Sequence, residues 1–81
     1  MSITEYTEFL VKSIVKEPDM VKVECFESDD EDKIIEIIVH ESDMGAVIGK
    51  NGRMATSIRT LIQAFAFTHD MKKVKINIDS F

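Results

Sequence analysis

The segment VIGKNGR, residues 47–53, holds two of the three glycines in the chain, with a lysine and an asparagine between them and an arginine after them. Gly49 and Gly52 have no Cβ atom, so the backbone of another molecule can approach them closely. Lys50 adds a mobile cation, and Asn51 adds an amide that can bond to phosphate or sugar oxygens or support the turn. The first N–H groups of a following helix attract anions. These residue types are suited to binding a sugar-phosphate backbone, although two glycines three positions apart are common and a plain corner between two helices would also explain them.

The charge around this segment differs from that of the whole chain. The formal net charge of −5 argues, taken alone, against a nucleic-acid partner. However, residues 1–43 hold 13 of the 15 acids and only 4 of the 10 bases. No acid lies within residues 44–69, a window that contains Lys50, Arg53 and Arg59. Local charge steers a ligand more than total charge does, although a solvated cationic face would give the same pattern.

The sequence on either side predicts two helices that meet at a four-residue turn. Ser42 or Asp43 can cap a short helix over residues 44–48. Gly49 would end this helix, because a left-handed residue at a helix end is commonly glycine. A longer helix is expected from about residue 53 to 67, and its predicted buried side consists of Met54, Ile58, Leu61, Ile62 and Phe65.

The rest of the chain predicts one more helix and three strands. Ser2 and Glu5 form a capping box at the start of an N-terminal helix, and Pro18 marks its expected end. Alternating apolar residues predict two strands joined by the polar stretch 28–33, and a third near the C-terminus. The three strands are expected at about residues 20–27, 34–40 and 72–79. The order helix, strand, strand, helix, helix, strand predicts an α+β fold with helices on one face of the sheet.

Length and composition limit the number of domains, the class of protein and its location. Eighty-one residues, 44% hydrophobic and 31% charged, predict a single ordered domain over residues 1–81. No apolar run approaches the ~18 residues of a membrane helix, and the first residues do not resemble a signal peptide. A single cysteine cannot form an internal disulfide. We therefore expect a cytoplasmic protein without a membrane segment.

Other residues that could carry chemistry form no recognisable site. His40 and His69, taken with Cys25, lack metal-ligand spacing. Cys25 continues the apolar alternation of its strand and is expected in the core. The acidic stretch ESDDED, residues 27–32, could suggest a cation site, but it lacks a ligand pattern and a solvated loop is the expected reading. With no nucleophile paired with a base, we expect no enzymatic activity, no metal and no cofactor.

The run DMGAVIGKNGRMATSIRTLIQA, residues 43–64, resembles a KH domain, whose G-x-x-G loop clamps the backbone of about four nucleotides. The element order α-β-β-α-α-β resembles the type II arrangement. With the opening segment, residues 6–23, the likeness extends over essentially the whole chain to the small bacterial single-KH RNA-binding proteins of the KhpA type. This chain departs from that family in its acidity and in the bulk of Phe65 and Phe67.

The resemblance implies that Gly49, Lys50, Asn51 and Gly52 form the backbone clamp. It also makes Val39, Val47, Ile48 and Ile58 the edges of an apolar base groove, although most of the area of these residues is expected in the core. From the charge pattern, Arg53 and Arg59 are added as candidate RNA-binding cations. Single-stranded RNA, or DNA, is the implied ligand, because the bases of a duplex cannot reach such a groove. Aromatic stacking is not expected, since tryptophan is absent and Tyr6 is predicted to lie elsewhere.

Two functions follow as hypotheses. One is an RNA-binding protein acting as an RNA chaperone or post-transcriptional regulator. The alternative, favoured by the acidic half, is a protein-interaction scaffold with a KH shape and little RNA affinity. The family resemblance implies a homodimer or a complex with a larger KH-containing protein of the Jag type. We expect the dimer contact on the long helix, where Phe67 and part of Ile62 are predicted to face away from the sheet.

Overall fold

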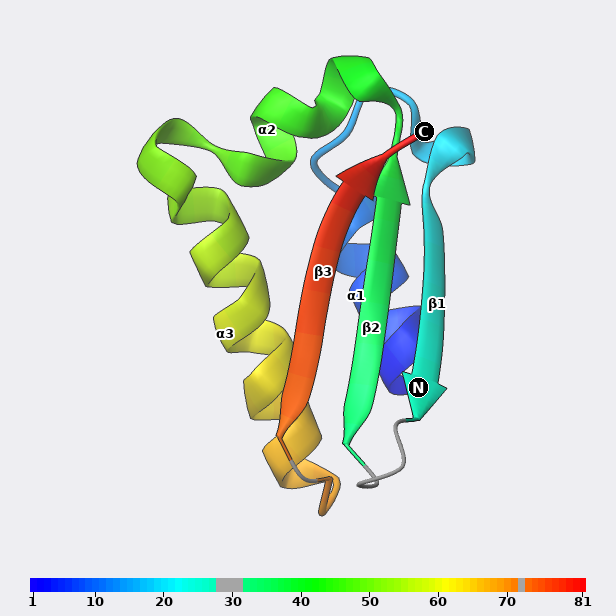
Figure 1. The fold of residues 1–81 in the computed structure, drawn as a ribbon, viewed down its shortest axis with the longest axis vertical. Coiled ribbons are helices and arrows are strands. Elements are labelled where there is room, and N and C mark those ends of the chain that lie inside the picture. Colours follow the sequence, from blue (N-terminus) through cyan, green and yellow to red (C-terminus); the bar gives the residue numbers. More distant parts are fainter. Residues whose placement is uncertain (28–31, 72) are drawn as a thin grey trace.

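The computed structural model describes residues 1–27, 32–71 and 73–81. Its helices are α1 (Ile3–Lys12), α2 (Met44–Ile48) and α3 (Arg53–Thr68), and its strands are β1 (Lys22–Glu27), β2 (Lys33–Val39) and β3 (Val74–Ser80). The sheet has the order β1-β2-β3, with β1 antiparallel and β3 parallel to β2. The helices cover one face of the sheet (Figure 1). The expected α+β class is confirmed, with the element order of a type II KH fold.

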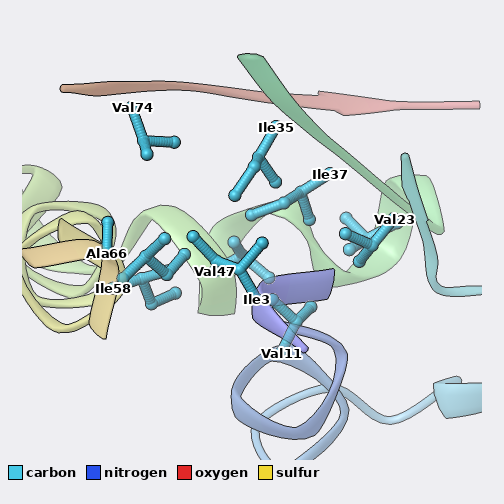
Figure 2. Close-up of a cluster of buried hydrophobic side chains, with 11 residues drawn as sticks. Ile3, Val11, Val23, Ile35, Ile37, Val47, Ile58, Ala66 and Val74 are labelled. Carbon is cyan, nitrogen blue, oxygen red and sulfur yellow. The ribbon is translucent and has the colours of Figure 1, made fainter. Parts of the chain in front are cut away.

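The core lies between the inner face of the sheet and the helices. Ile35, Ile37 and Val39 of β2 alternate toward this face and are fully buried, as predicted. Figure 2 shows side chains from all three strands pointing toward side chains of the helices. The helical contribution consists of Ile3, Val11, Val47, Ile58, Ile62 and Ala66.

Helix α1 begins as expected and ends early. The capping box is confirmed, because Glu5 N–H donates to Ser2 Oγ at 3.1 Å and Ser2 N–H donates to Glu5 Oε1 at 3.0 Å. The helix ends at Lys12, where Ser13 is the C-cap and donates its hydroxyl to Phe9 O at 2.6 Å. Pro18 therefore does not end α1; it begins a separate 3-10 turn before β1.

The buried side of α3 differs from the predicted one. Its fully or nearly fully buried residues are Ala55, Ile58, Ile62 and Ala66. The burial of Ile62 is confirmed, and it has no outward-facing part. Leu61 and Met54, expected inside, are 45% and 37% exposed, so their prediction as buried residues is wrong. The inward-facing side of α3 thus includes two small residues, Ala55 and Ala66, in place of the larger Leu61 and Met54. The expected exposure of Phe67 is confirmed at 66%.

The larger aromatic residues of the helices connect α1 to α3. The rings of Tyr6 and Phe65 stack with centroids 4.8 Å apart, and the ring of His69 stacks on Phe65 with centroids 4.0 Å apart. The bulk of Phe65 is thus used in the contact between the two helices.

Two further expectations concern β1 and the connection that follows it. Cys25 is exposed, so its prediction as a core residue is wrong; β1 is an edge strand whose distal half extends past the buried cluster. The acidic stretch 27–32 and the polar connection 28–33 fall mostly on residues 28–31, which lie outside the described residues.

Candidate nucleic-acid interface

The four-residue turn expected between two helices is present. Helix α2 ends at Gly49, whose N–H donates to Gly45 O at 2.9 Å, and α3 begins directly after Gly52. Between them a single 3-10 turn, Lys50–Gly52, is closed by Gly52 N–H donating to Gly49 O at 3.2 Å. Asn51 at its centre has a φ of 58°, which is a left-handed conformation. We call residues 49–52 the GKNG turn.

The two glycines are required for different reasons. Gly49 has φ 77° and ψ 174°, a region of the backbone map that is essentially restricted to glycine. Gly52 has φ 74° and ψ 11°, which is a left-handed conformation directly before the first residue of α3. A Cβ atom at position 52 would meet nothing within 4 Å, which leaves space beside this residue for another molecule.

The polar side chains of the turn face solvent. Lys50, Asn51 and Arg53 are exposed, as is Arg59 farther along α3. Within residues 1–27, 32–71 and 73–81 the one ion pair joins Lys22 Nζ to Glu24 Oε1 at 3.1 Å, on β1. The first turn of α3 contains no acidic residue, and Gly52 offers no side chain to cap it. The cations and the helix start together make this end of the molecule a suitable partner for an anion.

The apolar residues expected along a base groove lie mostly in the core. Val39 and Val47 have no exposed surface and Ile58 is 4% exposed, because all three pack between the sheet and the helices. They therefore support the turn from beneath and cannot present edges to a base in this conformation. Ile48 is half-buried at the end of α2 and is the one of the four with accessible surface.

Asp43, which was expected from the sequence only as a helix cap, is a buried residue that holds the start of α2 in place. It occupies the N-cap position of α2 but makes no side-chain cap hydrogen bond there. Its carboxylate is 2% exposed and accepts from the backbone N–H groups of Lys16 at 2.9 Å and Glu17 at 3.0 Å. It thereby ties the loop after α1 to the helix that leads into the GKNG turn. No local pattern reveals this contact, because the partners lie 27 and 26 positions away.

The short turn before α2 has a cap of its own. Ser42, the other expected cap, donates its backbone N–H to Nδ1 of His40 at 3.1 Å. The histidine side chain thus fills the role of the capping oxygen at the start of Glu41–Asp43. His40 and His69 both have local structural contacts, and no cluster of three or more metal-ligating side chains occurs in the part of the chain that the structure describes. Over the same residues no helix is long and apolar enough to cross a membrane.

Solved structures with a similar fold include the Era protein of Aquifex aeolicus bound to GDP.AlF4-, with a TM-score of 0.64 and 20% identity. A structure of Era with MgGDPNP and nucleotides 1506–1542 of 16S ribosomal RNA gives a TM-score of 0.65, also at 20% identity. Each alignment covers 98% of this chain and 30% of the Era chain. At this identity the likeness concerns the fold alone, and this chain corresponds to less than a third of Era.

Curated relatives are closer in sequence. The chain is 45% identical over 62 residues to the RNA-binding protein KhpA of Borreliella burgdorferi, covering 76% of this chain and 74% of the relative. It is 42% identical over 74 residues to the RNA-binding protein KhpA of Clostridium perfringens, covering 91% and 96%. Residues 4–78 match the family model described as KhpA/KhpB, KH domain. The chain therefore belongs to the KhpA/KhpB KH-domain family.

Proposed function

We propose that this protein binds single-stranded RNA and that the GKNG turn clamps the sugar-phosphate backbone. The observation that carries the proposal is the open space beside left-handed Gly52, flanked by exposed Lys50 and Arg53. A phosphate placed there can accept hydrogen bonds from backbone N–H groups and from both cations. The names of the curated relatives, RNA-binding proteins, support the same ligand class.

The bases would lie along the side of α3 that faces β3. Ile48 contributes apolar surface beside the GKNG turn. The half-buried Ile76 and Ile78 contribute further apolar surface on β3. Stretched single strands can place their bases on such a surface, whereas stacked and paired bases cannot. Val39, Val47 and Ile58 act indirectly, by fixing the position of the turn and of the helix.

The affinity of one such turn is expected to be low. Non-specific nucleic-acid complexes have dissociation constants of roughly 10⁻⁴ to 10⁻⁶ M at physiological salt. We therefore place the protein among RNA chaperones or post-transcriptional regulators of the cytoplasm that contact many RNAs weakly. Two linked turns would bind one RNA far more tightly than one turn does.

A homodimer would supply the second turn. Leu61 of α3 and Phe9 of α1 are 45% and 60% exposed. Each lies about one helical turn from a residue of the Tyr6–Phe65 stack that joins α1 to α3, Leu61 from Phe65 and Phe9 from Tyr6. Exposed apolar side chains gathered on a small domain favour a protein contact. We propose this surface for self-association or for a Jag-type KH partner, in place of the surface around Ile62, which is buried.

The proposal is tested by titrating the protein against a fluorescently labelled RNA octamer, free and annealed to its complement. We expect binding of the free strand in the micromolar range, weaker binding of the duplex, and affinity that falls as salt rises. An absence of RNA binding, together with self-association or capture of a KH partner, would favour the scaffold alternative.

A further inference from the structure

The sheet has a second face, opposite the one that packs on the helices. Successive side chains of a strand point to opposite faces, so the residues between the buried ones point away from the helices. In Figure 1 α1 lies behind the strands, and among the described residues no helix lies over the side toward the viewer. We call this side the outer face. Its side chains are Lys22, Glu24 and Phe26 of β1, Ile34, Glu36 and Ile38 of β2, and Lys75, Asn77 and Asp79 of β3.

The strand register arranges these side chains in three rows across the sheet. The rows are Lys22, Ile38 and Asp79; Glu24, Glu36 and Asn77; and Phe26, Ile34 and Lys75. The central strand therefore presents Ile34 and Ile38 on either side of Glu36, each roughly 7 Å from it along the strand. Phe26, which is 47% exposed, extends the apolar surface beside Ile34.

Glu36 is a carboxylate at the centre of this face. Glu24 lies directly opposite it on β1, and like charges in that arrangement destabilise a sheet. Glu24 Oε1 is 3.1 Å from Lys22 Nζ, whereas Glu36 forms no ion pair in the described part of the chain. Both glutamates are half-buried. A cation from another molecule, placed over Glu36, would offset this repulsion at the same time as its neighbours covered the two isoleucines.

Neither RNA nor a second copy of this chain matches the charges of the outer face. Glu24, Glu36 and Asp79 would repel phosphates, and they would repel an anionic lipid surface for the same reason. A twofold contact centred on this face would place the two copies of Glu36 against each other. Removing both of these carboxylates from water without a cation would oppose the association.

We propose that the outer face binds an amphipathic helix of another protein, in which an arginine or lysine lies between two apolar residues. A helix that lies along β2 has residues four positions apart at about 6 Å, close to the spacing of Ile34, Glu36 and Ile38. The matching pattern is apolar, basic and apolar at positions i, i+4 and i+8. The basic residue pairs with Glu36, and the apolar residues cover Ile34 and Ile38. The GKNG turn stays free, because α2 and α3, which it joins, do not lie over this face (Figure 1).

The test uses two fluorescently labelled helical peptides based on alanine and glutamine, with leucine at positions i and i+8. One peptide carries arginine at position i+4 and the other carries glutamate. In anisotropy titrations of the parent, we expect the arginine peptide to bind about tenfold more tightly than the glutamate peptide. Glu36→Lys should remove this preference, because its cation would face the arginine. Glu41→Lys makes the same change at an exposed position outside the outer face, and this matched control should keep the preference.

Ile38→Thr tests the apolar part of the contact. Threonine keeps a β-branched side chain that suits a strand and removes apolar surface, so both peptides should bind more weakly. Its affinity for a single-stranded RNA octamer should equal that of the parent, because the outer face carries no RNA contact in this proposal. The peptide titrations do not depend on RNA binding, so a failure here leaves the proposed function intact.

Four results would overturn the proposal. The parent could bind both peptides equally, or bind neither. Glu36→Lys could keep the preference for the arginine peptide. A loss of RNA binding by Ile38→Thr would assign the outer face to RNA. Sedimentation that shows weaker self-association of Ile38→Thr than of the parent would assign the face to a second copy of this chain.

Discussion

A Cβ atom at position 49 would lie 2.6 Å from the Cβ of Met54 and 2.8 Å from its backbone nitrogen. The turn at Gly49 therefore rests directly on the first turn of α3. This contact sets the direction of α3 relative to α2, and with it the shape of the space in which a phosphate would lie.

We predict that Gly49→Ala destabilises the protein far more than Gly52→Ala. The Cβ of an alanine at position 49 would clash with Met54, and the backbone there has a conformation that only glycine adopts readily. An alanine at position 52 would have open space around its Cβ, and its left-handed conformation would cost about 1–2 kcal/mol. In a domain of this size each kcal/mol lowers Tm by about 4–8 °C. Gly52→Asn should cost less than Gly52→Ala, because asparagine tolerates the left-handed region. Equal melting temperatures for the two alanine variants would contradict this assignment.

Leu61→Glu is expected to convert a homodimer into monomers. Its exposed side chain lies on the surface that we propose for self-association, and a charge there would have to be desolvated. Phe67→Glu, on the other flank of α3, should remain dimeric. Sedimentation at tens of micromolar measures both, since a dimer with a Kd of ~1 μM forms at that concentration. A monomeric parent, or a monomeric Phe67→Glu variant with a dimeric Leu61→Glu variant, would refute the proposed surface.

Asp43→Asn should lower the free energy of unfolding by roughly 1–3 kcal/mol. The carboxylate accepts two backbone N–H groups, and an asparagine would turn its own NH₂ group toward one of them. Glu41→Gln, two positions earlier and exposed, makes the same chemical change as a control and should have little effect. Urea unfolding of the two variants gives the comparison, and similar losses in both would show that the buried contact contributes nothing.

Because of the capping box, we predict that the stability of the fold decreases slightly at acidic pH. The hydrogen bond from the Ser2 backbone N–H, followed by the bond to its side chain, lowers the pKa of Glu5 from 4.5. A carboxylate whose pKa is lower in the folded state than in the unfolded state stabilises the fold at pH values above its unfolded pKa. This contribution is lost as the pH falls through the folded pKa. Between pH 6 and pH 3 the Tm of the parent should therefore fall more than that of Glu5→Gln. The same fall in both would show that the pKa of Glu5 is not lowered.

Sequence periodicity predicted the elements well because each has a local cause. The limits of α2 agree with the expected ones and α3 extends one residue further. Gly49 and Gly52, which lie between the two helices, mark the end of α2 and the start of α3. The alternation of Ile35, Ile37 and Val39 identified the inner face of β2 correctly. The KH resemblance placed the clamp residues on one turn, and their contact with RNA stays a prediction.

Periodicity failed where burial depends on what lies opposite. Ala55 and Ala66 mark the true inner side of α3, but their small size gave them less weight than Leu61. Thr7 is fully buried although it is polar, because its hydroxyl donates to Ile3 O at 2.8 Å. Of the four residues assigned to the base groove, Val39, Val47 and Ile58 are buried, as the alternation of β2 and the periodicity of α3 already indicated for Val39 and Ile58; the role of all four in base binding stays a prediction.

The most direct measurement of the central claim is RNA binding by a Lys50→Asp, Asn51→Asp double variant. Both side chains are exposed, so the fold should survive while two new negative charges repel the phosphates. The matched control is Lys75→Asp, Asn77→Asp, which makes the same changes at exposed positions of β3. We predict that the control binds a single-stranded RNA octamer as the parent does, and that the folded turn variant shows no measurable binding. A folded turn variant that binds as tightly as the parent would contradict the assignment of the GKNG turn as the clamp.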